Sequence, residues 1–432
     1  WKNHRETILN LFWRGLQLTV KDGVSFVIFL MAAKLLNPFE FGIYNYLLAV
    51  VFFLILFGDF GISVAASKYV AEYEAVDPAK VKYVLFNAGL VILAMTALVT
   101  AATLLGGPFL LQEKYRYTLF LLPVVFLAPM TSLYDGIYRG LKRFRRLALL
   151  STGVSVVSLG FIYGLISKYG LAGALISQNL FYLLLFLILA IGYRDVHLRW
   201  NRAIFSSVGF YALIIGIIHV SAFLYTRVDI LVLGSYNLIV EIGYYEIVNK
   251  VLMLLQLPFL VYAQVQAPNI VAAYCREGSP AILRKLTAYV AWGGAVTALL
   301  ALLIGLVTPW ILNWFLPQYD RPDVRLILNI FLFLFIFQNV SNLVGNTFII
   351  STGHARLNMV NIMVFGILSL VLNILFVRYY GYLGIAYAKS FVVVLGSLSL
   401  IIFYRLALKN GIWREGAPSS AQRTRQDTYL PE

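Results

Sequence analysis

The segment Ile8–Leu36 reads ILNLFWRGLQLTVKDGVSFVIFLMAAKLL, an apolar run long enough to cross a bilayer as one helix. Arg14, Lys21 and Asp22 interrupt this run. Seven residues make nearly two helical turns, so Arg14 and Lys21 share one face about 10 Å apart along the axis. A charge at the bilayer centre costs roughly 2.5–3.5 kcal/mol on insertion scales, and such residues usually face a polar interior. We therefore expect a polar, net-cationic stripe facing a cavity, with Gln17 on the same face.

Snorkelling is the alternative explanation for the first of these charges. Arg14 lies only about 9 Å inside the start of the helix, so its guanidinium can reach the headgroups. Lys21 lies near the helix centre, where neither membrane surface is close. The interior-facing interpretation is therefore stronger for Lys21 than for Arg14.

Composition indicates a polytopic membrane protein. Of the 432 residues, 61% are hydrophobic and only 12% are charged, and the mean hydropathy is +0.83. The segment before Ile8 is polar and the apolar run after it is too long for a cleavable signal peptide. Because residue 1 is Trp, we expect the natural start to lie upstream. A single cysteine, Cys275, excludes a disulfide within the chain.

Hydropathy and turn residues predict twelve membrane-spanning helices. Their expected ranges are 8–35, 41–65, 81–106, 116–138, 147–167, 172–193, 204–233, 241–267, 284–307, 323–350, 358–379 and 384–407. The fold class is therefore all-α, with two pseudo-equivalent six-helix bundles around a central cavity. We place the N-terminal bundle at 1–200, the C-terminal bundle at 201–412 and a cytoplasmic polar tail at 413–432.

Three internal matches support the division into equivalent halves. Phe41–Tyr44 (FGIY) matches Ile242–Tyr245 (IGYY), and Val70–Tyr73 (VAEY) matches Val271–Tyr274 (VAAY), both 201 residues later. Tyr169–Gly173 (YGLAG) matches Tyr380–Gly384 (YGYLG), 211 residues later. Chance similarity between apolar segments is the alternative. Six spans per copy is an even number, so both copies enter the membrane from the same side. That arrangement is a parallel repeat, with a site expected between the halves.

The basic residues predict the orientation of the chain. Most of the 34 Lys and Arg residues lie in one alternating set of connections. By the positive-inside rule, both termini are cytoplasmic, and we expect the protein in the cell (inner or plasma) membrane. We expect the basic run 139–146 to meet anionic lipid headgroups at the cytoplasmic face. Nucleic-acid binding by this run is disfavoured, because no aromatic-interleaved module accompanies it.

Several loose motifs resemble one transporter family. They are Leu35–Tyr44 (LLNPFEFGIY), Gly58–Ile62 (GDFGI), Lys68–Tyr73 (KYVAEY), Gly136–Leu141 (GIYRGL) and Tyr169–Ala174 (YGLAGA). Together they resemble polysaccharide-biosynthesis flippases, the Wzx-like O-antigen branch of the multidrug/oligosaccharidyl-lipid/polysaccharide exporter superfamily. The resemblance covers essentially the whole chain. It implies a V-shaped pair of six-helix bundles that moves lipid-linked sugars across a membrane by alternating access, and it carries no catalytic motif.

Polar side chains inside the expected helices are the candidate site residues. The substrate-binding candidates are Arg14, Gln17, Lys21, Asn45, Arg227, Asn249, Lys250 and Lys389. The candidates for ion coupling or a gate are Asp22, Asp229 and Glu246. Arg suits a phosphate through its bidentate fork, and Lys through its point charge. We expect a cationic track from the cytoplasmic to the outer half, no metal site, no cofactor, and Na⁺ or H⁺ as the possible coupling ion.

Some of these charges have purely structural explanations. Glu246 and Lys250 are four residues apart on a helix and can neutralise one another. His219, near the middle of its helix, is more often a satisfied core histidine than a proton carrier. Asp59 lies between two glycines, and a structural role at a closely packed helix end is enough to explain it.

Three functions remain, and a flippase is favoured. It would move a polyprenyl-pyrophosphate-linked oligosaccharide from the cytoplasmic to the outer leaflet, driven by an ion or the membrane potential, for cell-surface glycan assembly. Its expected partners are the lipid-linked oligosaccharide and glycan-assembly proteins. A multidrug or cation antiporter of the same fold would need an acidic, aromatic cavity. A membrane glycan polymerase or ligase would need an acid/base constellation near the outer surface, so we expect that the chain is not an enzyme.

Overall fold

The computed structural model describes residues 2–193 and 197–410, and within these ranges the chain forms helices and the turns that join them. The predicted polar tail at 413–432 lies outside the described residues. The chain divides into two compact units, Trp1–Tyr244 and Tyr245–Glu432.

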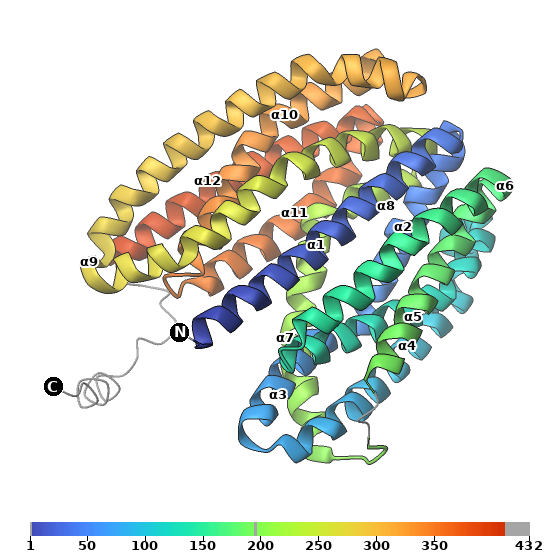
Figure 1. Cartoon of the computed structure of the whole chain (residues 1–432). Helices are drawn as coiled ribbons and strands as arrows, with labels where there is room; N and C mark the ends of the chain where they lie inside the picture. The colour runs from blue at the N-terminus through green and yellow to red at the C-terminus, as the bar shows by residue number, and fades with distance from the viewer. Residues whose placement is uncertain (1, 194–196, 411–432) are drawn as a thin grey trace. The chain divides into compact units, whose positions relative to one another are not determined.

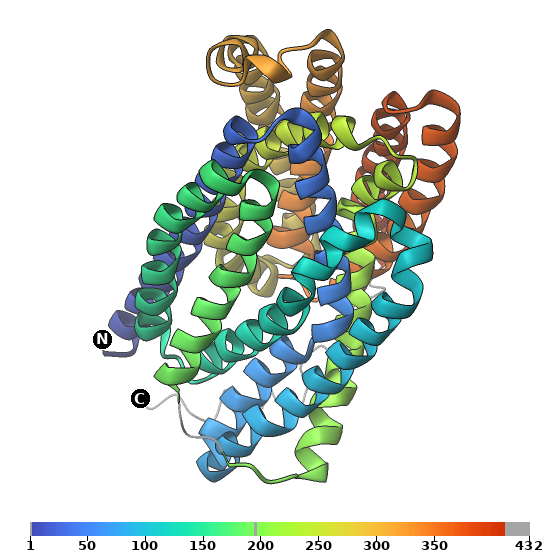
Figure 2. The same ribbon diagram turned by 90° about the vertical axis from the view of Figure 1, so that its right-hand side faces the viewer.

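The first unit is built from eight helices. They are α1 (Lys2–Leu35), α2 (Pro38–Asp59), α3 (Ile62–Val76), α4 (Val81–Leu111), α5 (Tyr115–Gly140), α6 (Phe144–Gly192), α7 (Arg202–Thr226) and α8 (Val228–Ser235). Helix α6 packs along both α1 and α5, and α3 packs against α5 and α7 (Figure 1, Figure 2). A core of buried apolar side chains joins α3, α4, α5 and α7, and Ile62, Ala88 and Ile137 lie within it.

The second unit contains most of α9 and the helices after it. The elements are α9 (Ile239–Phe315), α10 (Pro322–Leu343) with a π-helical turn (Val344–Ile349), α11 (Ala355–Tyr380) and α12 (Leu383–Asn410). Helix α9 is two helices in succession, because Gly278 adopts φ 71° and ψ −166° and the chain turns back there (Figure 1). Helix α12 lies beside both α10 and α11.

The predicted spans all fall on helix. Ten helical segments are long and apolar enough to cross a membrane in the part of the chain that the structure describes. Two of them, Pro78–Gly140 and Phe144–Gly192, each contain two of the predicted spans. The breaks inside them lie at Gln112, with φ 49°, and at Gly170, with φ 55°. The all-α, multi-span fold class is thereby confirmed.

The boundary between the compact units differs from the predicted bundle boundary at 200/201. Helices α7 and α8 belong to the first unit, because they pack against α2, and α7 also packs against α3 and α4. The division into two six-helix halves stays a prediction.

Local sequence explains both ends of α2. Asn37 caps the helix: its side chain accepts from the backbone N–H of Glu40 at 2.9 Å, and the Glu40 carboxylate accepts from the Asn37 N–H at 3.3 Å. Pro38 occupies the first helical turn, where its missing N–H costs nothing. At the other end, Phe60 and Gly61 adopt positive φ, and a Cβ at Gly61 would press on Ile215 of α7. The expected span 41–65 is therefore two helices, α2 and α3.

The hairpins at Gly170 and Gly381 have the same backbone geometry, as a repeat requires. Gly170 has φ 55° and ψ −130°, and Gly381, 211 residues later, has φ 58° and ψ −140°. Three residues further on, a Cβ at Gly173 would clash with the carbonyl of Leu165. A Cβ at Gly384 would clash with the carbonyl of Phe376, and both pairs are again 211 residues apart.

Candidate functional site

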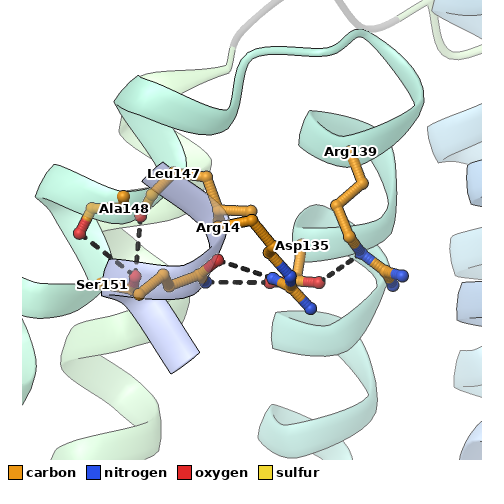
Figure 3. Close-up of polar contacts among 7 residues, drawn as sticks. Arg14, Asp135, Arg139, Leu147, Ala148 and Ser151 are labelled. Carbon is orange, nitrogen blue, oxygen red and sulfur yellow. Dashed lines mark hydrogen bonds and ion pairs between the residues drawn. The ribbon is translucent and has the colours of Figure 1, made fainter. Parts of the chain in front are cut away.

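A polar cluster joins α1 to α5 in the first unit (Figure 3). Arg14 of α1 donates from Nη1 to Gln17 Oε1 at 2.6 Å, and the same atom lies 3.4 Å from Asp135 Oδ1. Gln17 donates from Nε2 to Asp135 Oδ1 at 3.2 Å. Arg139, one turn after Asp135 on α5, places its Nε 2.7 Å from Asp135 Oδ2. Two guanidinium groups thus share one carboxylate, which leaves one surplus positive charge.

Helix periodicity explains how these four side chains meet. Arg14 and Gln17 are three residues apart on α1, and Asp135 and Arg139 are four apart on α5, so each pair lies on one helix face. The side chains of Arg14, Asp135 and Arg139 remain 28%, 24% and 30% exposed. They are therefore accessible to a ligand. Ser151 of α6 appears beside them in Figure 3, but its hydroxyl donates back to the Leu147 carbonyl at 2.7 Å.

Sequence reasoning named neither Asp135 nor Arg139 as a site residue. It assigned Arg139 to a cytoplasmic connection, and it left out Asp135, which lies inside the expected span 116–138. An acid followed four residues later by an arginine, within an apolar helix, is the signal that would have revealed it.

The residues of the predicted stripe on α1 have different surroundings. Gln17 is buried and Arg14 is half-buried, and both contact α5. Lys21 is exposed, and among the described residues it has no hydrogen bond or ion pair; Asp22 is half-buried.

Asp59 ends α2 and supports the start of α3. Its Oδ1 accepts from the backbone N–H of Ser63 at 3.0 Å and also from the Ser63 hydroxyl. This is the helix-end role that the sequence allowed.

The second unit holds a cation among aromatic rings. Lys389 of α12 donates from Nζ to the Tyr245 hydroxyl at 2.6 Å, and it lies 5.1 Å and 5.0 Å from the ring centroids of Tyr245 and Phe331. In the first unit, Gln178 of α6 donates from Nε2 to the Tyr44 hydroxyl, also at 2.6 Å. The tyrosines are 201 residues apart and the donors 211 apart. The same interhelical hydrogen bond therefore occurs in both units, and its donor is charged only in the second.

Three further candidates form hydrogen bonds within their own helices. Asn45 is buried and donates to the Phe41 carbonyl at 2.8 Å, which satisfies it within α2. Asp229 is buried in the first turn of α8, where its Oδ1 accepts from the Ile230 N–H at 2.9 Å. Glu246 is buried on α9 and accepts from Asn249 Nδ2 at 3.2 Å.

Two further candidates lie at or inside helices of the two units. Arg227 ends α7 and Lys250 lies on α9. Over the described ranges, no group of three or more His, Cys, Asp or Glu side chains is placed to hold a metal ion.

Comparison with known families decides the assignment. The model of the family described as polysaccharide biosynthesis protein matches residues 9–273. The chain belongs to this family. A comparison with curated proteins found no match.

Solved structures show the fold of this family member. An inward-facing multidrug resistance MATE family transporter of the MOP superfamily is similar with a TM-score of 0.73 and 14% identity, covering 92% of this chain and 98% of that one. Lipid II flippase MurJ, in an inward closed conformation, is similar with a TM-score of 0.68 and 16% identity, covering 93% and 87%.

A third similar structure is a MOP superfamily transporter from Pyrococcus furiosus described as having a binding pocket of reverse polarity. Its TM-score is 0.58 and its identity 18%, covering 93% of this chain and 96% of that one. This member of the polysaccharide biosynthesis protein family therefore has the fold of the MOP superfamily transporters and is a multi-pass membrane protein. The resemblance noted in the sequence is confirmed.

Proposed function

We propose that this membrane protein flips a polyprenyl-pyrophosphate-linked oligosaccharide from the cytoplasmic to the outer leaflet by alternating access. The observation that carries the proposal is the surplus positive charge of the cluster formed by Arg14, Gln17, Asp135 and Arg139. The family membership and the fold shared with lipid II flippase MurJ support it.

The chemistry of the cluster suits a pyrophosphate. Guanidinium groups bind phosphate oxygens in bidentate fashion, and Arg is favoured where such planar recognition is needed. Because Asp135 neutralises only one of its two arginine partners, a diphosphate arriving at the cluster can compete with it for both. A site with little water strengthens that attraction.

The other candidate residues keep their proposed roles. The proposed further substrate contacts are Lys21, Asn45, Arg227, Asn249, Lys250 and Lys389. Asp22, Asp229 and Glu246 are proposed to take H⁺ or Na⁺ or to form a gate. An ion can drive transport only if it binds one conformational state more tightly than the other.

The proposed orientation follows from the charge distribution. Both termini lie in the cytoplasm, the protein is in the inner or plasma membrane, and the basic run 139–146 meets anionic headgroups. Glycan-assembly proteins are the proposed partners.

Transport in liposomes tests the proposal. The purified chain would be reconstituted with a fluorescent polyprenyl-pyrophosphate oligosaccharide, and its movement between leaflets followed by quenching. We expect Arg14→Gln to lower the rate about tenfold, the equivalent of roughly 1.4 kcal/mol. Arg116→Gln, at an exposed arginine on the other end of α5, is the matched control and should transport normally. Normal transport by Arg14→Gln would contradict the assigned site.

A cation antiporter is the second candidate, favoured by the similarity to the multidrug resistance transporter. It needs an uncompensated acidic group to attract a cationic drug. Asp135 does not meet that need, because two arginines already hold its carboxylate. Uptake of a quaternary ammonium dye by the same liposomes, without flipping of the glycolipid, would favour the antiporter.

A further inference from the structure

Helices α2, α4 and α8 enclose an apolar cavity of about 590 Å³ within the first unit. Phe53 of α2, Val99 of α4 and Leu231 of α8 are among its walls. The polar side chains there are Thr103, whose hydroxyl donates to the Val99 carbonyl at 2.8 Å, and Tyr46. The cavity is within the size range of small-molecule sites, about 300–1,000 Å³. Walls with so few free polar groups fit a hydrocarbon better than a polar ligand.

Exposed apolar side chains of α4 border the cavity. Leu98 and Leu110 both line it, and they are 67% and 82% exposed. Their neighbour Phe109 is 84% exposed. Exposed apolar side chains on a helix long and apolar enough to cross a membrane favour contact with hydrocarbon over contact with water. A lipid chain can therefore enter the cavity sideways without passing through water.

Lys114 places a cation at the rim of the cavity. Lys114 Nζ is 5.5 Å from the centroid of the Tyr46 ring, which lines the cavity. It donates to the Gly234 carbonyl at 3.2 Å and to Asn237 Oδ1 at 2.5 Å. An ammonium has three donors, so these two bonds fix its position and leave one donor for a ligand. Lys114 follows the end of α4, and helix ends lie at the depth of the lipid headgroups.

We propose that this cavity holds one acyl chain of an anionic phospholipid, with Lys114 binding the lipid phosphate. The single charge of Lys114 matches the single negative charge of a phosphodiester, whereas a diphosphate carrier would remain largely uncompensated here. Glu113 is exposed and forms no ion pair with Lys114 in the described part of the chain. The bound chain packs between α2, α4 and α8 and so stabilises the first unit. The site does not depend on which substrate the protein transports.

Lipid retention by the purified full-length chain tests this site. The protein would be delipidated in detergent and mixed with phosphatidylglycerol or phosphatidylcholine of identical acyl chains, and bound lipid counted by native mass spectrometry. We expect phosphatidylglycerol to be retained preferentially. Ala102→Trp, which fills the cavity, should abolish retention, whereas Ala101→Trp, at an exposed residue on the neighbouring face of α4, should not.

A second substitution tests whether the charge of Lys114 contributes to lipid binding. Lys114→Gln keeps an amide donor for Asn237 but removes the charge, and it should weaken phosphatidylglycerol binding roughly fivefold, the effect of one lysine near an anionic headgroup. Lys168→Gln, at an exposed lysine placed over the Tyr169 ring, is the control and should leave binding unchanged. Equal retention of both phospholipids, or undiminished binding by Lys114→Gln, would overturn the proposal. Retention of a polyprenyl phosphate alone would assign the cavity to the carrier lipid and overturn it too.

Discussion

The Asp135 carboxylate lies between the guanidinium groups of Arg14 and Arg139 and offsets the repulsion between them. Asp135→Asn should leave Arg14 and Arg139 as unscreened like charges and lower the melting temperature by a few degrees. The pair interactions are worth about 0.5–1 kcal/mol, because all three side chains are about a quarter exposed. Adding Arg139→Gln should restore part of the stability, since it removes the repulsion. Thermal unfolding in detergent measures the cycle, and strictly additive losses would show that the residues are not coupled.

Substitutions at Lys389 can distinguish the effect of its charge on flipping from the effect of its hydrogen bond on stability. Lys389→Gln reproduces the donor that Gln178 supplies to Tyr44, so the hydrogen bond to Tyr245 and the stability should persist. Its loss of charge should nevertheless lower flipping several-fold if Lys389 contacts the pyrophosphate. Lys389→Met removes the hydrogen bond as well and should reduce both stability and flipping. Wild-type transport by Lys389→Gln would exclude a phosphate contact at this position.

At the scale of elements, hydropathy predicted where helices lie better than where they break. The expected span 204–233 is two helices, α7 and α8, because the chain leaves helical geometry at Arg227 while the apolar composition continues. Candidate residues were found where a charge interrupts an apolar run, as at Arg14. Asp135 was not recognised as a candidate because its partner Arg139, one helical turn away, was assigned to a loop. Partners such as Tyr245 and Lys389 are far apart in sequence, so no local pattern indicates their contact.

The two glycine hairpins should respond alike to added bulk. Gly384→Val would force a side chain against the Phe376 carbonyl, and Gly173→Val would do the same against Leu165. We expect each to destabilise its unit by about 1–3 kcal/mol, the usual effect of overpacking. Gly160→Val is the control, since nothing lies within 4 Å of a Cβ there. Melting temperatures of the three variants give the comparison, and a stable Gly384→Val would contradict the close helix approach.

At the scale of the whole molecule, the order of helices predicts which connections share a side of the membrane, and the distribution of basic residues predicts which side is cytoplasmic. Between Arg143 and Arg321 the chain runs through both halves of α6, then α7, then both halves of α9, which is an odd number of crossings. With one crossing for each of these helices, we expect the two residues on opposite sides of the membrane. The positive-inside rule predicts that Arg143 is cytoplasmic, because it belongs to a basic run, and the number of crossings then predicts that Arg321 is outside.

Cysteine labelling tests this topology in intact cells. The exposed native Cys275 would first be removed by the substitution Cys275→Ser. Arg143→Cys and Arg321→Cys would then be introduced into that variant one at a time. Both arginines are exposed, so a reagent can reach each position from its own side. A membrane-impermeant maleimide should label residue 321 in intact cells and residue 143 only after the cells are permeabilised. The reverse pattern would place the termini outside, and labelling of both residues from one side would require an even number of crossings between them and contradict the twelve-helix topology.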